Sequence, residues 1–178
     1  MGIPAPQREE LAGYLEQCRA AAPGVRWVEA ASLHLTLRFL GGLPEGALVR
    51  LAAGLRGIPV VPFQIRLGAT GTFGRAGAIR VVWLGVEGGR ADLMMLAGLI
   101  EEQCGVAGLE PESRAFNPHL TLGRARERGG TALPELPASP APSPWTAAGF
   151  GLYQSHLAPG GAVHSLLEEF EARAAGSR

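Results

Sequence analysis

The sequence contains no lysine: its 16 basic residues are all arginine, and Asp92 is its only aspartate. The formal net charge is zero, which argues against broad polyanion binding, because proteins of that kind carry a large basic excess. Without lysine, no nucleotidyl-lysine intermediate can form, which excludes one class of ligase. Arginine-only usage is typical of a GC-rich genome, although arginine is also the better bidentate ligand for phosphate.

Cysteine is scarce and long apolar runs are absent. Cys18 and Cys104 cannot make a disulfide framework or a four-cysteine zinc site, and their place in helical patterns predicts buried, reduced thiols. No 18-residue apolar run predicts a membrane helix, and residues 1–4 show no features of a signal peptide, so we expect a cytoplasmic protein. A hydrophobic fraction of 47% in 178 residues predicts a single folded domain over 1–178.

Apolar periodicity predicts three helices and at least five strands. Their irregular order is no βαβ alternation, which favours an α+β fold with antiparallel sheets. A loop with five prolines is expected to run over the surface in extended form, and the last segment fits a helix on periodicity alone. The predicted helices cover 6–22, 45–56 and 90–104; the strands 32–40, 62–69, 78–86 (buried on both faces), 116–125 and 146–157; the turn 71–77; the surface loop 127–145; and the periodic tail 163–174.

One tetrapeptide occurs twice, as His34-Leu35-Thr36-Leu37 and as His119-Leu120-Thr121-Leu122, in a chain with only four histidines. Both copies lie in alternating, strand-like sequence, where residues two apart share a face. Each copy therefore presents an imidazole and a hydroxyl side by side, while the leucines anchor the backbone in the core. Two such strands facing a cleft would bring two imidazoles and two hydroxyls to one small substrate, and the repetition suggests an internal duplication.

Two histidines with ordinary pKa values near ~6.5 can act at neutral pH as one base and one acid, and threonine hydroxyls can donate to phosphate oxygens. This set suits in-line attack on a phosphodiester without a metal ion. Two alternatives remain open: structural histidines, and a zinc site built from His34, His119 and a cysteine or glutamate. His156 and His164 have no such context and are interpreted as ordinary residues.

The two motifs and their flanks resemble the 2H phosphoesterases, and within them the RNA 2′,3′-cyclic phosphodiesterases, also called 2′-5′ RNA ligases. The resemblance extends over nearly the whole chain. It is carried by 27–28 and 33–41 around the first motif, 116–124 around the second, and 71–73, 81–86, 152–155 and 157–161 elsewhere.

The resemblance implies a bilobal α+β fold with two antiparallel sheets around a central cleft and a pseudo-two-fold axis; it also implies that the tail 163–170 is a strand. By carry-over, His34 and His119 are the catalytic pair, and Thr36 and Thr121 bind the phosphate. Three arginines near the motifs are further phosphate-binding candidates. Arg124 matches a phosphate-contacting position but needs a bulge to reach the face of His119, Arg38 shares the face of His34, and Arg126 is the third.

The activity implied is hydrolysis of RNA 2′,3′-cyclic phosphate ends to 2′-phosphomonoesters, with reverse 2′-5′ ligation, without metal, ATP or any other cofactor. The partners implied are RNA ends or small nucleotides with a cyclic phosphate, and neither a membrane nor an obligate protein partner. The alternatives are a phosphodiesterase for a small nucleotide and a non-catalytic RNA-end binding module. The family usually starts with a short apolar strand, of which only Ile3 is visible before Pro4, so we expect that strand to be truncated.

Overall fold

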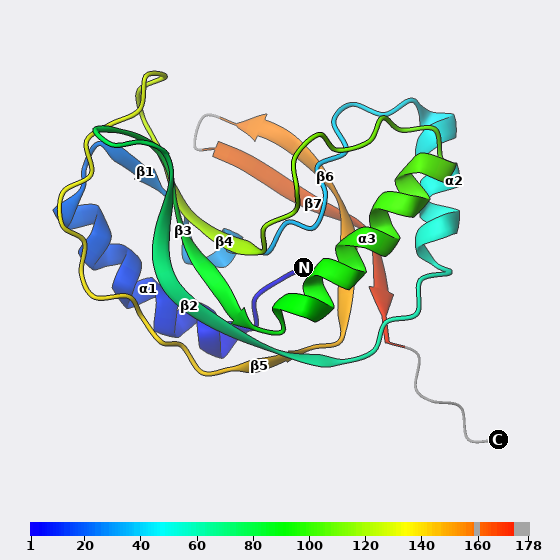
Figure 1. Cartoon of the computed structure of the whole chain (residues 1–178), viewed down its shortest axis with the longest axis horizontal. Coiled ribbons are helices and arrows are strands. Elements are labelled where there is room, and N and C mark those ends of the chain that lie inside the picture. Colours follow the sequence, from blue (N-terminus) through cyan, green and yellow to red (C-terminus); the bar gives the residue numbers. More distant parts are fainter. Residues whose placement is uncertain (159–160, 173–178) are drawn as a thin grey trace.

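The computed structural model describes residues 1–158 and 161–172 and has the predicted α+β architecture (Figure 1). Helices and strands do not alternate regularly, as expected. In chain order the elements are α1 (Ala5–Ala21), β1 (Val25–Trp27), the 3₁₀ helix η1 (Ala30–Ser32), α2 (Glu45–Leu55), β2 (Phe63–Arg75), β3 (Ala78–Gly88), α3 (Arg90–Val106), β4 (His119–Ala125), β5 (Trp145–Ala147), β6 (Gly149–Ala158) and β7 (Gly161–Glu171).

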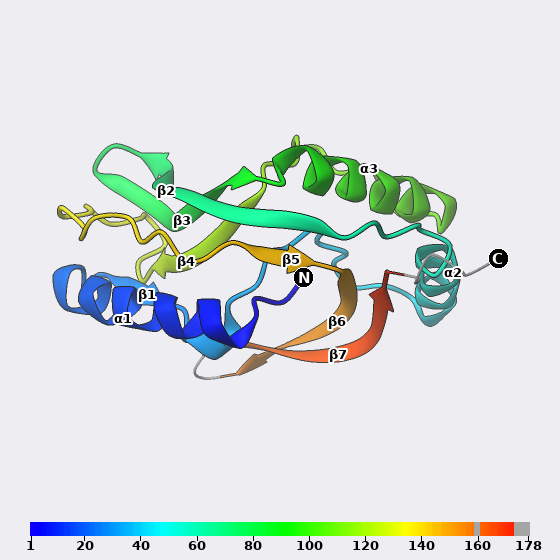
Figure 2. The same ribbon diagram turned by 90° about the horizontal axis from the view of Figure 1, so that it is seen from below.

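Two antiparallel sheets make up the strand layer, as the resemblance implied. The larger has the order β1-β4-β3-β2-β5, and the smaller consists of β6 and β7. Seen from below, the smaller sheet lies on the opposite side of β5 from the β2–β3 hairpin (Figure 2). The buried side chains of both sheets belong to one hydrophobic cluster, in which Phe150 of β6 stacks on Phe170 of β7 with ring centroids 4.9 Å apart. None of the described helices has the length and apolar character needed to cross a membrane.

The three helices lie close to their predicted bounds because their apolar stripes are clear in the sequence. α1 follows Pro4, has a second proline in its first turn, and buries the predicted face down to Cys18. α3 buries its predicted stripe through Cys104 and packs against α2. Both cysteines are free and buried, as predicted, and burial raises the pKa of each thiol.

The predicted strand 32–40 is wrong as a regular strand. Only His34 and Leu35 form isolated bridges, and the chain bends at Leu37. Beyond Leu35 the segment has no strand partner among the described residues, and the predicted alternation of buried side chains ends at Leu37, which is half-buried. The guanidinium of Arg38 instead forms ion pairs with Glu101 of α3 at 2.6 Å and with Glu112 beyond that helix.

The predicted turn 71–77 is also wrong in extent. β2 continues to Arg75, and only the two residues before β3 form the turn. Gly71 lies within β2 and is paired with Trp83. The indole ring of Trp83 occupies the space that a side chain at position 71 would need. β3 is not buried on both faces: Leu84 and its alternate neighbours are buried, whereas Trp83 and its alternate neighbours are half-buried. That half-covered face carries the candidate site.

The tail forms strand β7, as the resemblance implied, and the helix that its periodicity predicted is wrong. β7 pairs with β6 along its length, and of its apolar residues whose burial is described only Phe170 is buried. Backbone pairing in the hairpin, and not an apolar helical face, therefore determines the structure of this segment. Residues 173–174 of the predicted tail and residues 159–160 of the quoted family segment lie outside the described part. The predicted strand 146–157 is divided between β5 and β6.

The proline-rich loop is extended, as predicted. From 132 to 144 the chain forms no helix or strand, and it lies along α1 and β2. The hydroxyl of Tyr14 donates to the carbonyl of Pro137 at 3.4 Å, and the backbone N–H of Thr70 donates to the Ser139 hydroxyl at 2.8 Å. These contacts bind the loop to α1 and to the larger sheet.

Candidate active site

The two copies of the tetrapeptide are directly paired with each other. Leu35 of the first copy forms an antiparallel bridge with Leu120 of the second, and both leucines are buried. Directly opposite residues of an antiparallel pair share a face. Counting outward from this bridge, His34 lies opposite Thr121 and Thr36 lies opposite His119. The pairing therefore gathers both imidazoles and both hydroxyls on one face, where all four side chains are half-buried.

The first copy receives its support from the start of the chain and not from a regular strand. The backbone nitrogen of Met1 donates to the carbonyl of Leu35, and the Leu35 N–H donates to the carbonyl of Met1, both at 2.9 Å. Gly2 bridges His34, and Ile3 is buried in the core. The short segment 1–3 thus pairs with the first copy at the place where the family strand was expected.

A β-bulge in β4 brings Arg124 to the face of the two motifs. Between Thr121 and Gly123, β4 advances by two residues while β3 advances by one. Thr121 lies opposite Trp83, and Arg124 lies opposite Val81, two residues along the same face of β3. The shift supplies the bulge that strict alternation had required for Arg124.

Each of the two imidazoles is oriented by the same local hydrogen bond. Nδ1 of His34 lies 2.9 Å from the carbonyl oxygen of Ser32, and Nδ1 of His119 lies 2.7 Å from that of Asn117. A carbonyl can only accept, so Nδ1 must carry a proton in both rings. Nε2 is then the atom that gains or loses a proton in each ring, which is the arrangement that general acid–base chemistry requires.

His119 lies against an aromatic wall. Its ring meets Phe73 of β2 edge to face, with centroids 5.0 Å apart, and lies 6.2 Å from Trp83 of β3. Phe73 and Trp83 are themselves 5.2 Å apart. Gly71 allows this packing because it leaves room for the indole ring. The wall restricts how the imidazole can turn about its side-chain bonds and lines one side of the candidate site.

His34 lies against a third histidine that the sequence pattern did not indicate. Its ring is 4.8 Å from that of His164 on β7, which in turn lies 2.8 Å from the hydroxyl of Ser155 on β6. Sequence reasoning interpreted His164 as ordinary because it has no partner at short spacing. The only signal was the resemblance that made the tail a strand, since a β6–β7 hairpin can bring position 164 back to the motifs.

The surroundings of His34 favour its neutral form. Burial lowers the pKa of His34, and the positive charges of His164, the amino terminus and Arg124 lower that pKa further, against the opposing hydrogen bond to the Ser32 carbonyl. An imidazole kept neutral at neutral pH is suited to accept a proton.

Two of the candidate arginines are engaged elsewhere. Arg38 is largely buried in ion pairs with Glu101 and Glu112 and also donates to the backbone carbonyl of Glu110. Arg126 donates to the carbonyl of Pro23 at 3.0 Å. The structure therefore brings together His34, His119, Thr36, Thr121 and Arg124, and it does not bring Arg38 or Arg126 to them through any described contact. Among the described residues, no group of three or more His, Cys, Asp or Glu side chains gathers as a metal-ligand set.

Solved structures share this fold at useful sequence identity. The Thermus thermophilus protein TT0787 superposes with a TM-score of 0.83 and 31% identity, covering 98% of this chain and 96% of that protein. This fold and the two paired His-x-Thr motifs place the protein in the class of the 2H phosphoesterases.

Sequence comparison identifies the family within that class. The model of the 2′-5′ RNA ligase superfamily matches residues 6–158, and the chain belongs to this family. An Archaeoglobus fulgidus protein named RNA 2′,3′-cyclic phosphodiesterase is 32% identical over 92% of this chain and 93% of its own length. An Aeropyrum pernix protein of the same name is 37% identical over 63% of this chain, and the match spans 62% of that relative.

Proposed function

We propose that this protein hydrolyses RNA 2′,3′-cyclic phosphate ends to 2′-phosphomonoesters by a two-histidine mechanism that needs neither a metal ion nor ATP. The observation that carries the proposal is the bridge between Leu35 and Leu120, which gathers two imidazoles and two threonine hydroxyls on one face. The names of the curated relatives support the substrate class.

The roles of the two histidines follow from their surroundings. His34 acts as the general base, because the depressed pKa of His34 keeps its Nε2 free to accept a proton from water. The resulting hydroxide attacks phosphorus, the bond from phosphorus to the 3′ oxygen breaks, and His119 protonates the departing oxygen. The product carries its phosphate on the 2′ oxygen, and proton exchange with water restores both rings.

The remaining polar groups stabilise the charge on the reacting phosphate. The Thr36 and Thr121 hydroxyls donate to the two non-bridging oxygens, whose negative charge grows as the nucleophile attacks. Arg124, placed on the same face by the bulge, adds a positive charge. Arg38 takes no part in this proposal, because its guanidinium is held by two carboxylates.

The same site supports 2′-5′ ligation with an RNA 5′-hydroxyl in place of water as nucleophile, and the family description favours it. The two histidines keep their roles: His34 takes the proton of the 5′-hydroxyl, the 5′ oxygen attacks phosphorus, the bond from phosphorus to the 3′ oxygen breaks, and His119 protonates that oxygen. The phosphate then joins the 2′ oxygen of one strand to the 5′ oxygen of the other. No ATP is consumed because the strain and phosphate bond of the cyclic ester supply the free energy.

Turnover of a cyclic phosphate in excess EDTA tests the proposal. Purified protein is incubated with cytidine or adenosine 2′,3′-cyclic phosphate, and phosphorus NMR distinguishes the 2′-phosphate from the 3′-phosphate. The expected result is the 2′-phosphate alone, at a rate that EDTA does not change. Loss of turnover in EDTA would overturn the metal-free mechanism, and binding without turnover would identify an RNA-end binding module instead.

A further inference from the structure

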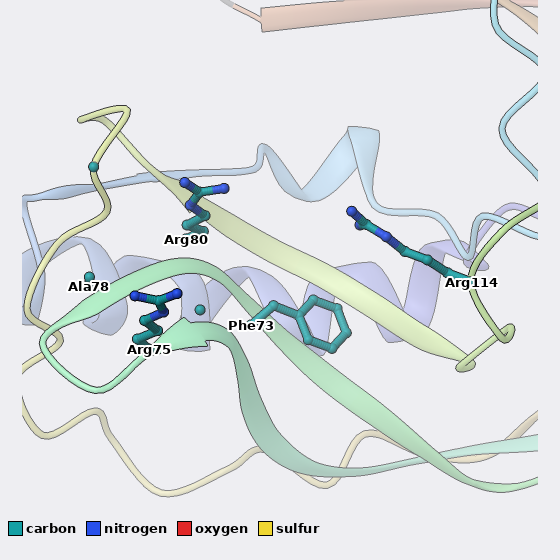
Figure 3. A pocket seen from close by; sticks show the side chains of 7 residues that line it. Phe73, Arg75, Ala78, Arg80 and Arg114 are labelled. Carbon is teal, nitrogen blue, oxygen red and sulfur yellow. The ribbon is translucent and has the colours of Figure 1, made fainter.

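A cavity of about 560 Å³ lies at the tip of the β2–β3 hairpin, beside the candidate active site. Three arginines line it: Arg75 at the end of β2, Arg80 in β3, and Arg114 in the segment before β4. Figure 3 shows the side chain of Arg114 extending toward the side of the cavity that carries Arg80, with the ring of Phe73 below the two guanidinium groups in this view. The cavity is thus rich in positive charge in a chain whose net charge is zero.

These three arginines differ from several others that the structure describes. Arg19, Arg56 and Arg66 each form an ion pair with a glutamate. Among the described residues, no carboxylate pairs with any arginine of the cavity, and none of their guanidinium groups takes part in a hydrogen bond. Three like charges around one space repel one another, and an anion between them would remove that repulsion.

A register shift in the hairpin brings Arg80 to the cavity. Between Phe73 and Gly74 the pairing of β2 with β3 shifts, so that Arg80 is the extra residue of β3. Gly74 has a φ of 130° and its backbone packs so closely on β3 that a side chain would collide with it. The bulge turns Arg80 away from the regular alternation of β3 and into the cavity lining.

Phe73 connects the cavity to the candidate active site. It lines the cavity and meets the ring of His119 at 5.0 Å. A ligand with its reacting phosphate at His119 would therefore extend past one aromatic ring to reach the arginines. Positive charge that alternates with an exposed aromatic ring is the arrangement by which proteins follow a single-stranded nucleic acid.

We propose that this cavity binds the backbone phosphate on the 5′ side of the nucleotide that carries the cyclic phosphate, so that the protein prefers an RNA strand to a mononucleotide. The inference rests on the proposed function, since it takes the reacting phosphate to lie at His34 and His119. It adds a second phosphate site to the first. Because one cavity holds few phosphates, the preference rises from one nucleotide to two and then levels off.

The test compares three substrates with the wild-type protein: cytidine 2′,3′-cyclic phosphate, a dinucleotide ending in the same group, and that dinucleotide with an uncharged methylphosphonate linkage. We expect kcat/KM to be about tenfold higher for the natural dinucleotide than for the mononucleotide, as for a charge-assisted phosphate contact. The methylphosphonate should lose this gain, since it keeps the base but removes the charge. Added salt should reduce the gain as well.

The variant Arg75→Gln/Arg80→Gln/Arg114→Gln supplies the second arm. It should turn over the mononucleotide at the wild-type rate, lose the preference for the dinucleotide, and no longer distinguish the phosphodiester from the methylphosphonate. Arg66→Gln is the matched control, because it removes one exposed arginine of β2 that is paired with Glu87. The wild-type comparison of the two dinucleotides keeps the test decisive if the triple variant does not fold.

Failure of this inference can be told apart from failure of the proposed function. Turnover of all three substrates with equal kcat/KM would overturn the second phosphate site and leave the hydrolase intact. A methylphosphonate effect that persists in the triple variant would assign the contact to other residues. A fourth substrate, cytidine 2′,3′-cyclic phosphate with a 5′-phosphate, separates strands from free nucleotides: a gain in kcat/KM with it but none with the dinucleotide would overturn the preference for a strand. Absence of turnover with every substrate would overturn the proposed function itself.

Discussion

The two copies of the tetrapeptide have the same sequence but are held by different structures. The second copy lies in β4, which pairs with β3 on one edge and with β1 on the other. The first copy has only isolated bridges, to Gly2 and to Leu120. Even so, both imidazoles donate from Nδ1 to the carbonyl two residues before them. The local tetrapeptide orients its side chains by itself, and the surroundings then make the two copies chemically unequal.

The unequal surroundings of the two copies explain how one repeated motif can supply both a general acid and a general base. His119 is held by two aromatic rings, whereas His34 lies against a third histidine and near Arg124. When catalysis begins, one of the two imidazoles must be neutral, to accept a proton, and the other must be protonated, to donate one. A cationic neighbourhood around one copy favours that division. Substitutions in and around the two copies test whether their surroundings make them unequal, and the largest effect is expected at the imidazoles themselves.

Removal of either imidazole should produce the largest loss. We expect His34→Ala and His119→Ala each to lower kcat by about 10²–10⁴-fold, the usual contribution of a positioned acid or base. Steady-state hydrolysis of a cyclic phosphate measures this, with His156→Ala as the control, since His156 is exposed. Wild-type kcat in either active-site variant would remove that histidine from the proposed mechanism.

The threonines should be equivalent if the pairing of the two copies is as regular as the Leu35–Leu120 bridge indicates. We expect Thr36→Val and Thr121→Val, which keep the shape but lose the hydroxyl, each to lower kcat/KM by about 10–100-fold, as for a hydrogen bond to a charged oxygen. The control is Thr72→Val, at an exposed position of β2. A loss confined to one of the two variants would show that only one copy holds the phosphate.

The bulge of β4 should be sensitive to a single methyl group. The Cβ of an alanine at position 123 would meet Val25 at 2.6 Å and Trp27 at 3.0 Å, so Gly123→Ala should destabilise the protein by about 1–3 kcal/mol. Gly13→Ala in α1 meets nothing within 4 Å and should not destabilise it. Urea unfolding compares the two variants. Equal stability would mean that the contact between β1 and the bulge adapts freely.

Much of the fold and of the candidate site could be predicted from the sequence. The features that could not be predicted depend on contacts between residues far apart in the chain. The stripes of α1 and α3 and the His-x-Thr spacing are local signals, and the need for a bulge before Arg124 followed from parity. The ion pairs of Arg38 join it to glutamates more than 60 residues away along the chain. The cavity of three arginines depends on a bulge in a hairpin, and the contact of His34 with His164 depends on where a separate sheet packs. Such long-range contacts leave no periodic trace.

The contact with His164 should set the acid side of the pH profile. His34 must be neutral to act as a base, and the acid limb of kcat/KM reports the pKa of that base in the free enzyme. Burial and then the charge of His164 lower the pKa of His34, so His164→Ala, which admits water and removes a cation, should raise this pKa and move the acid limb to higher pH. Activity should fall near pH 5 and change little near pH 8.

Two further variants separate this electrostatic role from simple packing. Ser155→Ala removes the partner of the His164 ring and should move the acid limb in the same direction by a smaller amount, whereas His156→Ala on the same hairpin should leave it in place. An acid limb that His164→Ala leaves unmoved, or moves to lower pH, would contradict the assignment of His34 as the base. That result would favour His119 as the general base. It would mean that His164 affects the pKa of a residue, His34, that accepts no proton in the rate-limiting step.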